Sequence, residues 1–111
     1  NEHESELIIL SVVDYPPEYF AEAPQVIEKE ISKRADYLSK LEEGCMKYGV
    51  KARKFLKEGA AEEKIVETAE ETSSQLIVLG TYGRKGIKRL LMGSTTERVL
   101  SEGICPVLVV K

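Results

Sequence analysis

The chain of 111 residues lacks the residue patterns on which common catalytic sites and membrane anchors depend. Its only histidine, His3, lies in a polar and acidic segment, so no Ser-His or Cys-His catalytic pair is available. Cys45 and Cys105 are isolated and form no CxxC motif, which is typical of reduced cysteines in an intracellular protein. No apolar run approaches the ~18 residues of a membrane span. We therefore expect a cytoplasmic protein.

The composition is that of an ordinary globular protein, with 42% apolar and 32% charged residues. It lacks internal repeats, low-complexity tracts and linkers, so residues 1–111 are predicted to form one domain. The net charge of −3 gives no general attraction for nucleic acid or anionic membranes. We therefore expect neither of these as a partner.

Strand-like and helix-like segments alternate along the chain. Solidly apolar runs predict strands, and apolar residues at steps of three and four predict helices. The predicted strands are Leu7–Val13, Val50–Leu56, Leu76–Gly80 and Val107–Val110, and the predicted helices run from Pro24 to Tyr48, Ala61 to Thr72 and Thr95 to Glu102. This order predicts an α/β fold in which helices sandwich an open parallel sheet.

The predicted helices also indicate which residues face the core. The first should bury a stripe of six residues: Ile27, Ile31, Ala35, Leu38, Leu41 and Cys45. The last should turn Val99 and Leu100 inward. The run Leu7–Val13 has the character of a strand buried on both faces, whereas Val50–Leu56 alternates and should lie near a sheet edge.

The most unusual segment lies between Glu71 and Glu97, which contains no acidic residue. Its four cations stand in a chain of net charge −3, so the remainder of the chain sums to −7. Three glycines lie in the loop and a fourth directly before Ser94. The cations are Arg84, Lys85, Lys88 and Arg89, and the glycines are Gly80, Gly83, Gly86 and Gly93. Positive charge, exposed backbone N–H groups and a helix start together favour a phosphate site.

Each of these features also has an explanation without a ligand. The loop has neither the GxxxxGK[ST] nor the GxGxxG phosphate motif, and its glycines and cations also suit a solvated turn. Ser94 and Glu97 have the spacing of a capping box, which stabilises a helix without any ligand. Tyr82 could stack on a base or simply be an exposed loop residue. The residues alone leave both interpretations open.

With these residues in view, the whole chain resembles the universal stress protein family. The most specific feature is a Gly-2x-Gly-9x-Gly-Ser/Thr signature, matched here by Gly80, Gly83, Gly93 and Ser94. Three further segments support the resemblance: SVVD at 11–14, RLLMGSTTERVL at 89–100 and CPVLVVK at 105–111.

The resemblance implies a fold of the adenine nucleotide α-hydrolase-like kind, dimerisation and, for the signature-bearing branch, ATP binding. By matched position, Val12 would contact adenine through its backbone. The ribose and phosphates would lie against Leu79, Gly80, Tyr82 and Gly83, and the triphosphate would be held by Gly93, Ser94, Thr95 and Thr96. Arg84 is a further candidate binding residue because of its positive charge. No carboxylate lies in the loop to hold a metal, so a Mg or Mn ion would arrive with the phosphates.

One departure from the family pattern concerns the start of the fold. Family members open with a strand ending in an aspartate, followed by a helix, before the strand matched here by Leu7–Val13. In the family this first strand lies between the strands matched here by Leu7–Val13 and Leu76–Gly80. We therefore expect the usual first strand and helix to be missing from residues 1–111, or a strand from elsewhere to fill their place. A rarer alternative is that the two flanking strands pair directly.

Three functions follow, in order of preference. The first is an ATP-binding module of stress response or signalling, without catalytic residues of its own. The second is an interaction or regulatory module of the same fold that binds no nucleotide, and the third is a slow ATP hydrolase. The apolar run Val107–Val110 further predicts a homodimer, because an exposed apolar strand edge favours pairing with a second copy.

Overall fold

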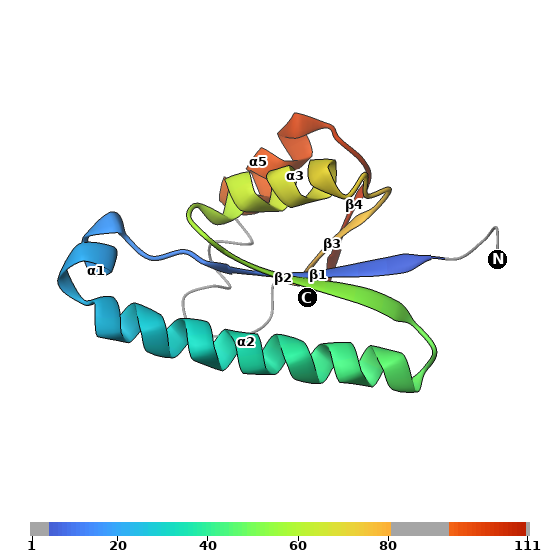
Figure 1. Cartoon of the computed structure of the whole chain (residues 1–111). Helices are drawn as coiled ribbons and strands as arrows, with labels where there is room; N and C mark the ends of the chain where they lie inside the picture. The colour runs from blue at the N-terminus through green and yellow to red at the C-terminus, as the bar shows by residue number, and fades with distance from the viewer. Residues whose placement is uncertain (1–4, 81–93, 111) are drawn as a thin grey trace. The chain divides into compact units, whose positions relative to one another are not determined.

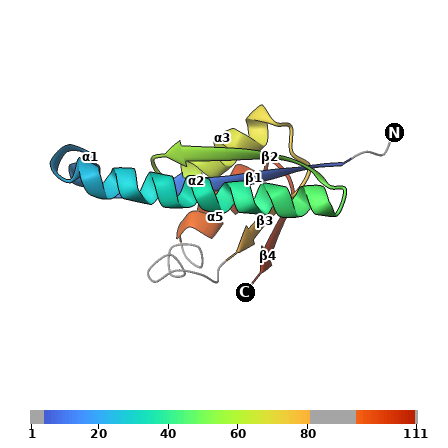
Figure 2. The same ribbon diagram turned by 60° about the horizontal axis from the view of Figure 1, so that its bottom comes forward.

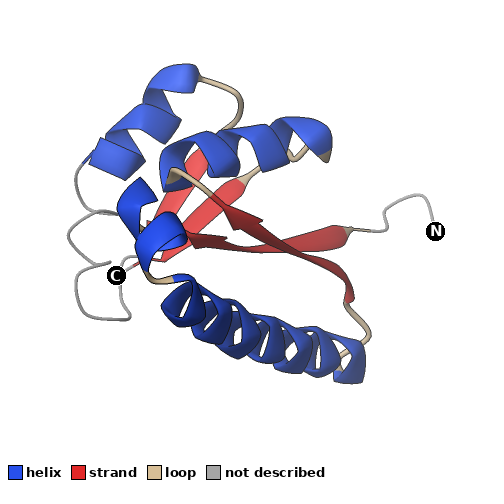
Figure 3. Cartoon of the chain, turned by 60° about the vertical axis from the view of Figure 1, so that its left-hand side comes forward, coloured by secondary structure: helices blue, strands red, loops and turns tan. Residues whose placement is uncertain are grey.

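The computed structural model describes residues 5–80 and 94–110. The described chain is an α/β protein in which strands alternate with helices, as Figure 3 shows by colour. Its contacts divide it into two compact units, residues 1–60 and residues 61–111.

The first unit contains two strands and two helices. They are β1 (Glu6–Val13), α1 (Pro17–Glu22), α2 (Pro24–Lys47) and β2 (Lys51–Glu58). β1 and β2 pair in parallel from Glu6 opposite Lys51 to Val13 opposite Glu58. The long helix α2 lies along one face of this pair (Figures 1 and 2), which confirms the predicted arrangement of parallel strands covered by a helix.

The helix α2 begins at Pro24, as the sequence predicts, and ends at Lys47, one residue before the predicted end. Pro24 occupies its first turn, where the missing N–H costs nothing. At the other end Gly49 has φ +72°, and the N–H of Val50 donates to the carbonyl of Cys45 at 2.9 Å. This is the hydrogen bond of a Schellman motif, and it needs glycine at the left-handed position.

The second unit contains α3 (Ala61–Glu71), β3 (Ile77–Gly80), α5 (Ser94–Glu102) and β4 (Val107–Val110). β3 and β4 pair in parallel, with Ile77 opposite Val107. The core of this unit joins α3, β3 and α5 and consists of Ala69, Ile77, Leu79 and Val99, against which Ile65, Val66, Cys105 and Val107 pack. The opposite face of this strand pair carries Val78 and Leu108, which are 56% and 53% exposed.

Several predictions about local structure were wrong in detail. The helix α1 was not predicted, because the proline pair at 16 and 17 has the character of a turn, yet Pro17 takes the first position of a helix. Leu100 is exposed although Val99 is buried, because successive helical residues are turned by about 100° and only one of the two faces the core. Leu41 is likewise more than one-third exposed.

The prediction that β1 is buried on both faces was also wrong, since only Val13 is fully buried and the start of the strand is exposed. Each of the four described strands has a strand on one side only, so the expectation that β2 lies near a sheet edge stays a prediction. β1 and β3 are not paired with each other in that part of the chain. The expectation of an absent strand between them therefore stays a prediction.

Candidate functional site

In parallel α/β structures, ligands bind beyond the carboxyl ends of the strands. Two of the predicted binding residues lie at such an end, on β3. Leu79 is buried in the core of the second unit, and Gly80 is the last residue of the strand. The core contacts of Leu79 therefore fix the point from which the chain enters the glycine-rich segment. Tyr82, Gly83, Arg84 and Gly93 lie outside the described residues.

The start of α5 holds the remaining predicted phosphate contacts. Ser94 is the first residue of the helix, one position earlier than predicted, and Thr95 and Thr96 follow in the first turn. The first N–H groups of a helix have no partner within it, and the helix dipole gives this end a partial positive charge. The capping box of Ser94 and Glu97 remains a prediction.

Thr96 provides the most informative polar atom in this region. Its Oγ1 is buried and has no hydrogen-bond partner in the structure that residues 5–80 and 94–110 define. Buried polar atoms in folded proteins are nearly always paired, so an unpaired one marks a place where a water, an ion or a ligand is to be expected. Thr68 in the same unit shows the usual case, because its buried Oγ1 donates to the carbonyl of Lys64 at 2.6 Å.

At the carboxyl end of β1, Val12 has a partner that the sequence did not predict. The guanidinium of Arg34 on α2 donates to the Val12 carbonyl and, at 3.2 Å, to the Ser11 hydroxyl. Its Nε lies 2.7 Å from Glu30 Oε2, and both side chains are close to nine-tenths buried. One signal could have revealed this pair: Arg34 stands seven residues after Ile27, a helical position that points to the same side as the core stripe.

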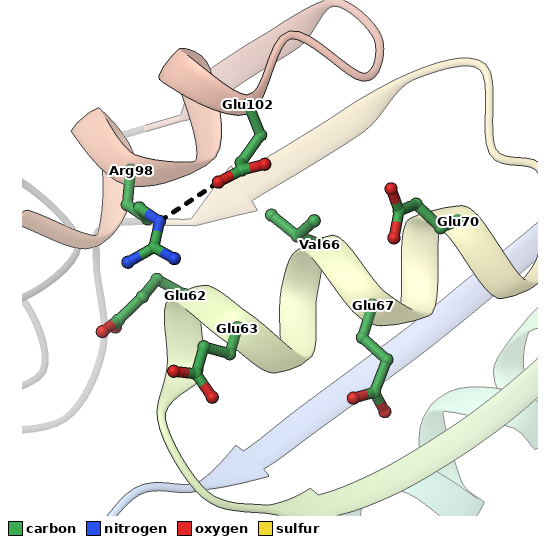
Figure 4. A pocket seen from close by; sticks show the side chains of 7 residues that line it. All are labelled: Glu62, Glu63, Val66, Glu67, Glu70, Arg98 and Glu102. Atoms are coloured by element: carbon green, nitrogen blue, oxygen red, sulfur yellow. Dashed lines mark hydrogen bonds and ion pairs between the residues drawn. The ribbon is translucent and has the colours of Figure 1, made fainter.

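A shallow pocket of about 200 Å³ lies between α3 and α5 (Figure 4). It is lined by Val66, five glutamates and one arginine, which are Glu62, Glu63, Glu67, Glu70, Glu102 and Arg98. Arg98 is already paired with Glu102 at 3.2 Å. The remaining negative charge would repel phosphate groups, so this pocket does not suit a nucleotide.

The described ranges contain neither a metal-binding cluster nor a membrane-spanning helix. No group of three or more His, Cys, Asp or Glu side chains there could hold a metal ion. Within the same ranges, no helix has both the length and the apolar character needed to cross a membrane.

Parallel strand pairs that alternate with helices define an α/β protein. The universal stress protein family model matches residues 1–111, and the chain belongs to this family.

Individual relatives agree with this assignment. Universal stress protein MJ0531 of Methanocaldococcus jannaschii is 38% identical over 114 residues, which cover 99% of this chain and 67% of the relative. Universal stress protein YxiE of Bacillus subtilis is 31% identical over 92% of this chain and 68% of its own length. The chain thus spans about two thirds of each.

Two solved structures have the same fold. The structure of protein MJ0577, also of M. jannaschii, matches all of this chain and 78% of its own with a TM-score of 0.77 and 27% identity. Universal stress protein UspA of Lactobacillus plantarum gives a TM-score of 0.78 at 23% identity, over 99% of this chain and 80% of its own, and supports the fold alone.

Proposed function

We propose that this universal stress protein binds ATP, as a cytoplasmic module of stress response or signalling. The observation that carries the proposal is the buried Oγ1 of Thr96 in the first turn of α5, which has no hydrogen-bond partner among the described residues. Thr96 belongs to the segment in which the family signature ends, so the unpaired atom and the signature point to the same ligand. The two free cysteines are consistent with a reducing compartment.

The proposal assigns separate parts of the nucleotide to separate residues. The Val12 backbone contacts adenine, and Leu79, Gly80, Tyr82 and Gly83 line the ribose and phosphates. Gly93, Ser94, Thr95 and Thr96 hold the triphosphate, with Arg84 adding positive charge. A Mg or Mn ion, where present, enters with the phosphates. The helix start favours the anion by about 0.3–1 kcal/mol before hydrogen bonds are counted.

Calorimetric titration of ATP, ADP and AMP into the purified protein tests the proposal. We expect ATP to bind with a dissociation constant near or below micromolar, about −8 kcal/mol. Gly93→Val should abolish binding, because a side chain there would occupy the space of the phosphates or forbid the backbone conformation.

A matched control is Gly44→Val in α2. Nothing lies within 4 Å of a Cβ added at Gly44, so this variant should fold and bind like the parent. ATP binding by Gly93→Val as tight as by Gly44→Val would show that the phosphate assignment is wrong. The absence of binding by the parent would favour the alternative, an interaction module that holds no nucleotide.

We also propose a homodimer formed through β4. Within the described residues β4 pairs only with β3, so its other edge has no strand partner there. The unbroken apolar run of this strand and the half-exposed Leu108 give such an edge the character of a pairing surface. A two-fold axis would let two copies of β4 pair with each other.

A further inference from the structure

The carboxyl end of β1 is closed by a charge pair that no part of the proposed function requires. Arg34 and Glu30 are 13% and 12% exposed, and their side chains join at 2.7 Å. Burying two charges is unfavourable unless each finds partners, and the guanidinium finds two more on β1: the Ser11 hydroxyl and the Val12 carbonyl.

The direction of the Val12 carbonyl explains this contact. The next carbonyl along, that of Val13, accepts a hydrogen bond from the N–H of Gly59 at 3.1 Å, just past the end of β2. Successive carbonyls of a strand point to opposite sides, so the Val12 carbonyl points away from β2. No described strand pairs with β1 on that side. Arg34 therefore supplies the hydrogen bond that a ligand or a further strand would otherwise make.

We infer that Arg34 competes with the 6-amino group of adenine for the Val12 carbonyl and so limits the affinity and base selectivity of the nucleotide site. The inference rests on the proposed function, in which the Val12 backbone contacts the base. An amino group is a donor and needs an acceptor, but here a charged donor already occupies the acceptor. A purine with a 6-oxo group would instead accept a hydrogen bond from the guanidinium.

Two variants test the inference. Arg34→Met keeps the length of the side chain and frees the carbonyl, but it deprives Glu30 of its ion pair and can destabilise the fold. The double variant Glu30→Gln/Arg34→Met removes both charges of this pair. It replaces the single variant in the titrations if Arg34→Met folds poorly. The control is Lys40→Met, which removes the exposed ion pair of Lys40 with Asp36 on the same helix.

ATP and inosine triphosphate, which differ in the base at position 6, are the probes. Their dissociation constants are measured by calorimetry for the parent and the variants, after circular dichroism shows normal folding. Freeing the carbonyl should tighten ATP binding about tenfold and raise the preference for ATP over inosine triphosphate by a similar factor. The control should change neither value. A merely structural role of Arg34 would not alter the ratio.

The affinities for ATP and inosine triphosphate distinguish the inference from the proposed function. Tighter ATP binding by the Arg34 variants than by the parent, together with a raised ratio, supports the competition. An unchanged ratio in variants that bind ATP overturns the inference and leaves the proposed function in place. If neither the parent nor either variant binds a nucleotide, the proposed function fails and the inference with it.

Discussion

Thr96→Val is expected to stabilise the protein while weakening its nucleotide binding. The substitution exchanges a hydroxyl for a methyl group of nearly the same size, and threonine and valine have similar helix propensities. In the part of the chain that the structure describes, the Oγ1 of Thr96 is buried and has no hydrogen-bond partner. The change therefore acts on one desolvated oxygen inside the fold.

The magnitude follows from the cost of that oxygen. A buried hydroxyl without a hydrogen bond destabilises a protein by about 1–3 kcal/mol. Replacing it with an apolar group should raise the free energy of unfolding by roughly 1–2 kcal/mol, a shift of the urea midpoint on the order of 1 M. Loss of a hydrogen bond to a charged phosphate, about 1.5–3 kcal/mol, should weaken ATP binding roughly ten- to hundredfold.

The assay is urea unfolding followed by circular dichroism, with calorimetric titration of ATP into both proteins. Thr68→Val is the matched control, because Thr68 is 3% exposed and its Oγ1 donates to the Lys64 carbonyl. This control should lose about 0.5–1.5 kcal/mol of stability and leave the affinity for ATP unchanged. A Thr96→Val protein less stable than the parent, or one that binds ATP equally well, would refute the reasoning.

Three further changes follow from the same structure. Arg84→Gln should weaken ATP binding less than Gly93→Val does, and the difference from the parent should shrink as salt rises, as titrations at two ionic strengths would show. Val109→Lys should shift the protein toward monomer in ultracentrifugation, and a parent that is monomeric at high micromolar concentration would rule out the β4 interface. Leu38→Ala, at a 3% exposed position, should lower the free energy of unfolding by about 2–5 kcal/mol, as urea unfolding would show. Leu41→Ala, at a more exposed position, should lower it by less than about 1 kcal/mol. Equal losses for the two variants would contradict the observed packing of α2.

The sequence by itself determined the order and type of most elements. Local patterns carry this information: β-branched runs form β1 and β4, and the period of three to four residues forms α2. Gly49 marks the end of α2 because the left-handed conformation there is available to glycine at little cost. The glycine signature likewise marked the end of β3 and the start of α5 as the candidate site, because its spacing can be read from the sequence alone.

Only the tertiary structure decided which polar groups find partners. The contact of Arg34 with the Val12 carbonyl joins residues 22 positions apart. No local sequence pattern predicts which group a guanidinium will contact at that separation. Thr68, in the middle of α3, has the local carbonyl of Lys64 as its partner, but for Thr96 in the first turn of α5 the sequence names no partner, and the described residues supply none. Hydrogen bonding depends on direction and distance between elements, and these are set when the core packs rather than by the periodicity of any one segment.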